Sequence, residues 1–286
     1  MKGFVVLIAM FLPFFAQAQR LHLDVYAGVS NYQGDLQDAL FTLKNSKPAF
    51  GLGLTYDLTN HLALRGSFHI AKVEGDDAQN TSGKGTELRN LNFTSNITEG
   101  NLALQYNILD IAEYGFTPYV FAGAAVYKFN PYTTVDSSDD KIYLQPLRTE
   151  GQGLAEYPDR KPYKLTQFAI PFGGGIKLAL TENIEAGFEL GFRKLFHDYL
   201  DDVSTNYADP VILAANVSPL SAALAFRGDE LPNGIAFPGA GEQRGNPGLK
   251  DWYYITGLRL SFLLGNGNGG GGGRKSRGTG CPTNIY

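Results

Sequence analysis

The sequence is poor in the residues that build disulfide frameworks and metal centres. Its 286 residues include one cysteine, Cys281, and four scattered histidines, so an internal disulfide framework is excluded and no metal-ligand spacing occurs. The formal net charge of −4 gives no electrostatic case for binding nucleic acid. Beyond the N-terminal segment, no apolar run approaches the length of a transmembrane helix. If this chain spans a membrane, it must therefore do so with strands.

The N-terminal segment has the pattern of a secretory signal peptide. Lys2 supplies the charged start, residues 4–15 form an apolar core, and Ala16-Gln17-Ala18 has the form of a cleavage site. Gln19 would be the new end, and the absence of a cysteine there argues against a lipoprotein. We therefore divide the chain into a signal peptide (1–18), a main domain (19–264) and a tail (265–286).

Alternation of apolar and polar residues predicts eight strands in the main domain. The clearest are 252–264 and 184–196, where apolar residues recur at every second position. The other six cover residues 21–30, 50–56, 62–70, 91–107, 116–129 and 164–180. We expect the last strand to pair with the first, because the open edge of a sheet cannot lie in lipid.

The connections between these strands alternate in length. Those after the second, fourth and sixth strands are short and the others are long, as in bacterial outer-membrane barrels. The predicted fold is all-β, an eight-stranded antiparallel transmembrane β-barrel with long extracellular loops and both termini in the periplasm. The alternative, a soluble lipocalin-like barrel, would place the apolar faces inside. We further expect Tyr26, Tyr127 and residues 252–254 to lie in interfacial aromatic girdles.

In the membrane form the polar faces line the barrel lumen. They bring together charges of both signs and two histidines: Asp24, Arg65, Lys177, Glu185, Glu189, Arg193, Arg259, His22 and His69. An eight-stranded barrel is just wide enough for side chains to fill it. We therefore expect a plug of paired charges, in preference to an ion path or a general porin.

Candidates for catalysis or metal binding are weak. We find no convergent Ser/His/Asp set and expect neither an enzyme nor a cofactor; the pair His197-Asp198 at a strand end is a weak signal. Four acidic residues, Asp198, Asp201, Asp202 and Asp209, could offer oxygen ligands to calcium, but their spacing is not that of an EF-hand. The apolar residues 211–226 could form a helix over the barrel mouth, although we expect simple loop packing.

The loops also carry more specific patterns. These are GVSNYQGDL (28–36), RNLNF (89–93), FAGAAVYKFNP (121–131), TEGQG (149–153), DYLDDVSTNYAD (198–209), RGNPGLKDWY (244–253) and CP (281–282). Together they resemble the PorG-like outer-membrane barrels of the Bacteroidetes type IX secretion system. The resemblance implies a non-enzymatic scaffold of the secretion and gliding machinery. Its implied partners are the PorK/GldK-type lipoprotein and the PorN/GldN-type periplasmic ring subunits.

The C-terminal tail agrees with such a role. Residues 265–273 form a glycine-rich tether. The partner-binding residues that we predict follow it: Arg274, Lys275, Arg277, Cys281 and Pro282. An odd cysteine in an oxidising compartment suggests an intermolecular disulfide, so we expect Cys281 to crosslink to or dock on a ring subunit. The alternative function is a stand-alone barrel that binds a ligand or surface through its outer loops, as an adhesin does.

Overall fold

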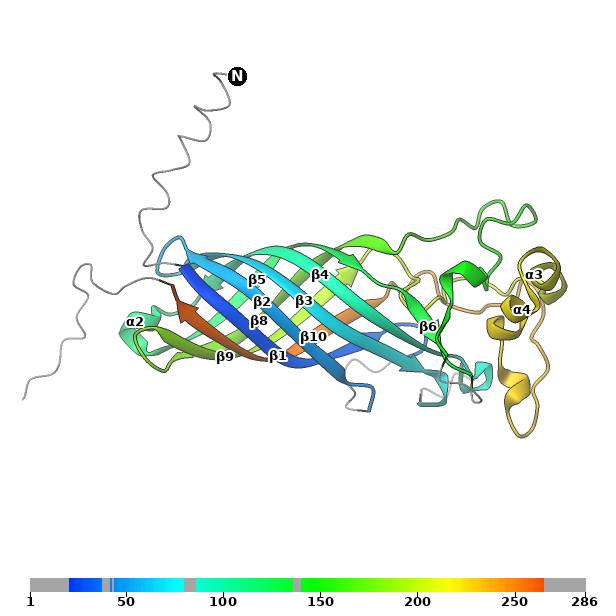
Figure 1. Ribbon diagram of the computed structural model, residues 1–286, viewed down its shortest axis with the longest axis horizontal. Coiled ribbons are helices and arrows are strands. Elements are labelled where there is room, and N and C mark those ends of the chain that lie inside the picture. The colour runs from blue at the N-terminus through cyan, green and yellow to red at the C-terminus, as the bar shows by residue number, and fades with distance from the viewer. Residues whose placement is uncertain (1–20, 38–41, 43, 80–85, 136–139, 265–286) are drawn as a thin grey trace, which may run out of the picture.

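The computed structural model describes residues 21–37, 42, 44–79, 86–135 and 140–264. The predicted signal peptide and the predicted partner-binding tail lie outside this range. Long antiparallel strands dominate the described part (Figure 1). Their bounds are β1 (Leu21–Gln33), β2 (Lys47–Asp57), β3 (Leu62–Asp76), β4 (Asn92–Asn107), β5 (Phe116–Lys128), β8 (Thr166–Ala179), β9 (Ile184–Leu195) and β10 (Trp252–Leu263).

These strands close into a barrel of eight. Each pairs antiparallel with its neighbours in the order β3-β2-β1-β10-β9-β8-β5-β4, and β3 pairs with β4 to complete the circle. The first and last strands pair along their length, from His22 opposite Leu263 to Gln33 opposite Trp252. The predicted fold class and the predicted closure are both confirmed. Two short strands, β6 (Pro131–Thr133) and β7 (Ile142–Tyr143), extend the sheet beyond β4.

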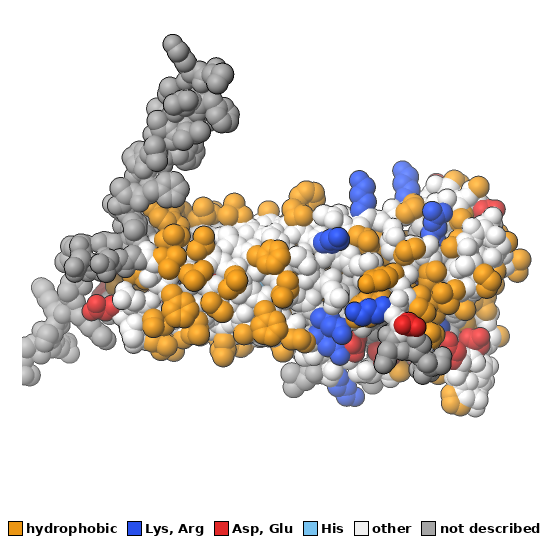
Figure 2. All heavy atoms as spheres, in the orientation of Figure 1, with side chains coloured by type: hydrophobic (Ala, Val, Ile, Leu, Met, Phe, Trp, Pro, Cys, Tyr) orange, Lys and Arg blue, Asp and Glu red, His pale blue; other side chains and the backbone are white. Residues whose placement is uncertain are grey.

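The apolar faces point outward. On β10, Leu258 is 65% exposed while its neighbour Arg259 is only 4% exposed. Phe168 on β8 is 68% exposed, and the visible outer surface of the barrel is studded with apolar side chains (Figure 2). This arrangement is the inverse of a soluble barrel, because aliphatic surface of this extent is stable only against hydrocarbon. Within the described residues, no helix has the length and apolarity needed to cross a membrane.

Several aromatic residues face the opposite way from that expected. Tyr26, Tyr127 and Tyr253 are at most 5% exposed and point into the barrel, so the girdle prediction is wrong for them. Tyr254 is buried as well, and Trp252 is half-buried. The reason is that a hydroxylated ring fills lumen volume and can also hydrogen-bond there, as Tyr253 does by donating its hydroxyl to Glu99. On β5 the aromatic face is therefore internal, and Val120 and Val126 form the outer face.

The two ends of the barrel differ in construction. One end carries the short turns, the helix α2 (Ile111–Tyr114) and the N-terminal end of β1 (Figure 1). The other carries the long loops, with the short 3-10 helices η3 (Asp77–Gln79), η4 (Thr86–Arg89), η5 (Gln145–Leu147) and η6 (Gly228–Glu230). We call the structure formed by these long loops the cap.

The loop before β10 contains two short helices where we expected none. These are α3 (Pro210–Asn216) and α4 (Pro219–Ala225). Each begins with a capping side chain followed by proline: Asp209 accepts hydrogen bonds at the start of α3, and Ser218 does so at the start of α4. The expectation of simple loop packing in residues 211–226 is therefore wrong, and these cap signals were present in the sequence.

Candidate functional site

The lumen holds a set of charged side chains that satisfy one another. Arg65 on β3 donates two hydrogen bonds to Glu189 on the opposite side of the barrel, from Nη1 to Oε2 at 2.8 Å and from Nη2 to Oε1 at 3.2 Å. The Tyr119 hydroxyl donates to the same carboxylate at 2.8 Å. All three side chains are buried. A bidentate pair of this kind fixes the geometry of both partners.

A second pair lies closer to the cap. Arg193 Nε donates to Glu99 Oε2 at 2.9 Å, and the Tyr253 hydroxyl donates to the same oxygen at 2.5 Å. Asn101 Nδ2 donates to Glu99 Oε1 at 2.6 Å. Glu99 is fully buried, and it was not among the lumen residues that we predicted. The alternation in β4 is clear only after residue 101, but following it backward two residues at a time would have placed Glu99 inside.

A third pair completes the chain of contacts. Arg259 donates to Asp24 Oδ2 at 3.0 Å, and Ser261 and Thr55 donate to the same carboxylate at 2.6 Å each. Gln105 Oε1 accepts from Arg259 at 3.0 Å and from Arg65 at 3.4 Å, which links the first pair to the third.

The predicted lumen residues all point inward. Lys177 pairs with Glu185 at 2.9 Å, His22 contacts Asp57 at 3.0 Å, and His69 lies 3.5 Å from Glu99. Each of the three lumen arginines therefore has a carboxylate partner, and tyrosines fill the space between them. The prediction of a lumen filled with paired charges is confirmed.

The cap is organised around one buried carboxylate, that of Glu150. It accepts hydrogen bonds from the backbone N–H of Ser204 at 2.9 Å and from the Thr205 hydroxyl at 2.6 Å. It also accepts from the Tyr199 hydroxyl at 3.0 Å and from Arg244 Nη1 at 3.0 Å. The Glu150 side chain is 0% exposed and that of Arg244 is 2% exposed. This carboxylate therefore joins the loop between β5 and β8 to two distant segments of the loop between β9 and β10.

Arg244 and Arg89 extend this arrangement across the barrel mouth. Arg244 donates to the carbonyl oxygens of Asp202 at 2.7 Å and Ala225 at 3.0 Å. Arg89 donates to the Arg244 carbonyl and to both oxygens of Asp77, at 2.6 and 3.0 Å. These bonds hold together the loops after β1, β3, β5 and β9, since Arg89 also donates to the Asp35 carbonyl at 2.8 Å.

Three other carboxyl groups in the cap, those of Asp198, Asp201 and Asp251, form no direct ion pair among the described residues; Lys250 acts on Asp198 only as a nearby charge. Tyr32 donates its hydroxyl to Asp201 and lies 3.3 Å from Asp251 Oδ1. Asp198 accepts from the Ser204 hydroxyl at 2.9 Å. Burial raises the pKa of Asp198 to about 7, and burial together with neighbouring carboxylates raises the pKa of both Asp201 and Asp251 well above the usual range.

The predicted acidic cluster does not converge on one point. Asp202 accepts from Thr149 and Tyr163, each at 2.6 Å, while Asp209 caps α3. Burial raises the pKa of Asp202 to about 6. In the part of the chain that the structure covers, no group of three or more His, Cys, Asp or Glu is placed to hold a metal ion. His197 stacks on aromatic rings and its Nε2 lies 2.5 Å from the Tyr127 hydroxyl, so its role is in packing.

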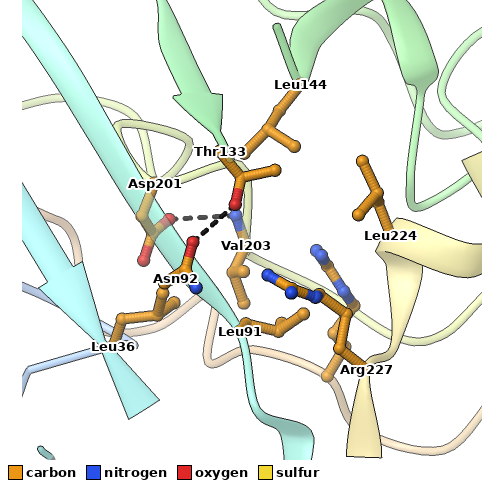
Figure 3. Close-up of a pocket in the computed structure, with 10 residues that line it drawn as sticks. Leu36, Leu91, Asn92, Thr133, Leu144, Asp201, Val203, Leu224 and Arg227 are labelled. Carbon is orange, nitrogen blue, oxygen red and sulfur yellow. Dashed lines mark hydrogen bonds between the residues drawn. The ribbon is translucent and has the colours of Figure 1, made fainter. Parts of the chain in front are cut away.

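A small cavity lies inside the cap (Figure 3). Its volume of about 10 Å³ holds roughly one water molecule. Leu36, Leu144 and Leu224 supply its apolar wall, and Asp201 and Arg227 line it as well. The hydroxyl of Thr133 donates to Asn92 at 2.5 Å beside it. A space of this size cannot hold a metabolite.

The loop motifs that we singled out by resemblance meet in the cap. Tyr32, Arg89, Glu150, Asp202 and Arg244 come from five different motifs, and each takes part in the buried hydrogen bonds described above. Sequence alone could not show this convergence, because the motifs are separated by whole strands. The five predicted tail residues, from Arg274 to Pro282, lie outside the described residues, so their prediction stands untested.

Comparisons with known proteins add a family and a general fold. The family model for the domain of unknown function DUF6089 matches residues 1–211. No curated protein sequence matches the chain.

Solved structures of small outer-membrane barrels are similar over most of this chain. Ail, the attachment invasion locus protein of Yersinia pestis, is 9% identical, covers 85% of this chain and 97% of its own, and has a TM-score of 0.39. Neisserial surface protein A is 6% identical, with 85% and 96% covered and a TM-score of 0.40. OprG from Pseudomonas aeruginosa is 11% identical, with 85% and 97% covered and a TM-score of 0.38. Likeness at this level carries no argument about function.

Proposed function

We propose that this chain, which belongs to the DUF6089 family, is a non-conducting anchor in the outer membrane and a scaffold of the type IX secretion machinery. The observation that carries the first part is the filled lumen. Three buried arginines are each bound to a carboxylate inside a barrel of minimal width, which leaves no continuous path for water or solute. A barrel of this kind acts through its two ends and not through its bore.

The second part of the proposal rests on the loop motifs. The residues that carry the resemblance to PorG-like barrels also form the buried bonds of the cap, so each of these motifs has a structural role in this chain. In this proposal the turn end and both termini face the periplasm. The tail then reaches the PorK/GldK-type and PorN/GldN-type ring subunits through Arg274, Lys275, Arg277, Cys281 and Pro282.

Deleting residues 265–286 in the native host tests the anchoring role. We expect the barrel to reach the outer membrane in normal amount, because the deletion begins after β10. We also expect secretion through the type IX route to stop and the ring subunits to be lost from a pull-down of the solubilised barrel. The matched control replaces residues 265–273 with a Gly/Ser linker of equal length and keeps Arg274 to Tyr286. Normal secretion by the deletion variant would overturn the proposal.

The cysteine is tested separately. In non-reducing gels of native membranes we expect a crosslinked band that Cys281→Ser removes. If the band persists in Cys281→Ser, then Cys281 is not the crosslinking residue.

A second function, binding through the outer loops, is favoured by the construction of the cap. Its ion pairs fix the loops in one arrangement, which presents apolar side chains outward: Val211 is 74% exposed and Leu249 is 60% exposed. A surface that is already ordered loses little entropy on binding. A variant with an opened cap and an intact tail would lose such binding but retain secretion, so the two functions can be separated.

A further inference from the structure

Lysines gather where the barrel meets the cap. Lys128 is the last residue of β5, Lys164 precedes β8 by two residues, Lys194 lies near the end of β9, and Lys250 precedes β10 by two residues. All four side chains are exposed. The strands β5, β8, β9 and β10 are consecutive neighbours in the barrel, so these residues form one arc along its rim. We call them the lysine arc.

The strand register places the lysine arc at the border of the apolar surface. Lys128 is paired with Thr166, the first residue of β8, and Lys164 precedes Thr166 by two residues on the cap side. Lys194 is paired with Ile170 on one side and with Trp252 on the other. Its Nζ lies 6.0 Å from the centre of the Trp252 ring. Tryptophan and lysine side by side at the edge of an apolar belt are typical of the boundary between hydrocarbon and headgroups.

Three members of the lysine arc, Lys128, Lys164 and Lys194, have no carboxylate partner among the described residues, whereas the charge of Lys250 acts on nearby Asp198 without a direct ion pair. The ion pairs among the described residues include none of its four members; by contrast, Lys47 on β2 pairs with Glu74 at 2.8 Å. Lys250 donates only to the Pro247 carbonyl, at 2.6 Å. Four ammonium groups on adjacent strands repel one another unless anions lie between them. The surface is therefore built for an external anion.

The opposite end of the barrel has the opposite charge. The turns at residues 57–61, 108–115 and 180–183 contain Asp57, Asp110, Glu113 and Glu182, and no lysine or arginine. Figure 2 agrees, since the basic side chains on the visible face all lie in the half that bears the cap. The two leaflets of the membrane that the barrel spans would thus meet rims of different sign.

We propose that the lysine arc binds the phosphate groups of an anionic lipid in the leaflet on the cap side. The arc lies at headgroup depth beside exposed aliphatic side chains, so a molecule that joins a phosphate to acyl chains can contact both surfaces at once. A phosphorylated lipid of the outer leaflet meets this description, whereas a free phosphate would use only the lysines. The proposal requires a barrel in a bilayer and is independent of any role in secretion.

The chain has a single tryptophan, Trp252, and it lies beside Lys194. Its fluorescence can therefore report ligand binding at the lysine arc. The full chain is folded in nanodiscs of phosphatidylcholine, and diphosphorylated lipid A is titrated while Trp252 fluorescence is followed. We expect a saturable change. Each lysine near a membrane surface contributes about fivefold in affinity, so Lys128→Gln with Lys164→Gln should weaken binding about 25-fold. Lys194 is left unchanged because its removal would alter the fluorescence directly.

The matched control is Lys141→Gln with Lys161→Gln, which removes the same charge from exposed loop positions. We expect it to change the affinity less than twofold. Equal weakening by both double variants would show that net charge alone is responsible and would overturn the proposal, as would wild-type affinity in the lysine arc variant. Inorganic phosphate at the same concentration should leave the fluorescence unchanged. If it reproduces the lipid A signal, then the site binds phosphate and not a lipid.

Discussion

Replacing Arg244 with methionine should open the cap and leave the barrel folded. Arg244 Nη1 lies 3.0 Å from the Glu150 carboxylate, and both side chains are almost completely buried. Methionine fills similar space but removes the charge and the donors to the carbonyl oxygens of Asp202 and Ala225. Glu150 is then a buried carboxylate without a cation.

The magnitude follows from what remains around Glu150. Removing one partner of a buried ion pair typically costs 3–5 kcal/mol, because the other charge stays desolvated. Here Glu150 retains donors from Ser204, Thr205 and Tyr199, so we place the loss near the lower end, at about 3 kcal/mol. The strands are not affected, since none of these groups lies in the barrel wall.

Limited proteolysis measures cap opening, and the shift of the folded band on unheated gels measures the barrel. A loss of about 3 kcal/mol corresponds to cleavage in the loops that is at least 100-fold faster when opening is rapid compared with cutting. The matched control is Arg160→Met, since Arg160 also donates to loop carbonyls, those of Glu150 and Asn206, but is half-exposed. For Arg160→Met we expect the loops to be cleaved less than tenfold faster than in the wild type.

A double variant tests whether the unpaired charge of Glu150 is what opens the cap. Adding Glu150→Gln to Arg244→Met removes the unpaired charge and should restore part of the protection, because a neutral amide is less costly to bury than a carboxylate. Cleavage of Arg244→Met at the wild-type rate would refute the view that this ion pair holds the cap. Loss of the folded barrel band in Arg244→Met would refute the independence of the two parts.

Two further predictions concern acid dependence and barrel closure. The pKa of Asp198 is raised to about 7, so its stabilising contribution is complete below pH 4 and is lost as the pH rises through 7; each unit of the shift is worth about 1.4 kcal/mol. The wild-type cap should therefore be cut faster relative to Asp198→Asn at pH 8 than at pH 5.5, by about 30-fold, because about 1.5 pH units separate pH 5.5 from this pKa. An equal ratio at both pH values would contradict this. At the seam between β1 and β10, a Cβ on Gly257 would lie 2.4 Å from the Ala27 carbonyl oxygen, whereas one on Gly100 meets nothing within 4 Å. Gly257→Val should abolish the folded band and Gly100→Ala should keep it; a normal folded band for Gly257→Val would show that the seam tolerates a side chain.

The barrel could be predicted because the alternation that specifies each strand lies within a short stretch of sequence. In β9 and β10 most outward positions are apolar, and lipid on one side with a polar lumen on the other leaves a single register that satisfies both. The inward tyrosines were missed for a physical reason. A tyrosine such as Tyr253 suits an interface and a polar lumen equally well, and only the position of Glu99, on the opposite side of the barrel, decides between them.

The cap could not be predicted, because its bonds join distant segments. Periodicity says nothing about Glu150 or Arg244, which lie in loops separated by β8 and β9. The helices α3 and α4 are short, and their cap residues Asp209 and Ser218 are as common in loops as at helix starts. The sequence did contain a set of specific loop motifs, but it did not show what role they have in the fold. In the structure, residues from these motifs form buried hydrogen bonds with one another in the cap.

Charged side chains are buried in different ways in the lumen and in the cap. We therefore expect the two parts to differ in stability. In the lumen each arginine lies within ion-pair distance of a carboxylate. In the cap, Asp198, Asp201 and Asp251 form no direct ion pair among the described residues, and burial raises the pKa of each carboxyl group, which favours the neutral form. Ionisation of these buried groups as the pH rises destabilises the cap, so we expect the cap to open before the barrel. An anchor needs the barrel alone, so such opening would alter contacts on the cap side without releasing the protein from the membrane.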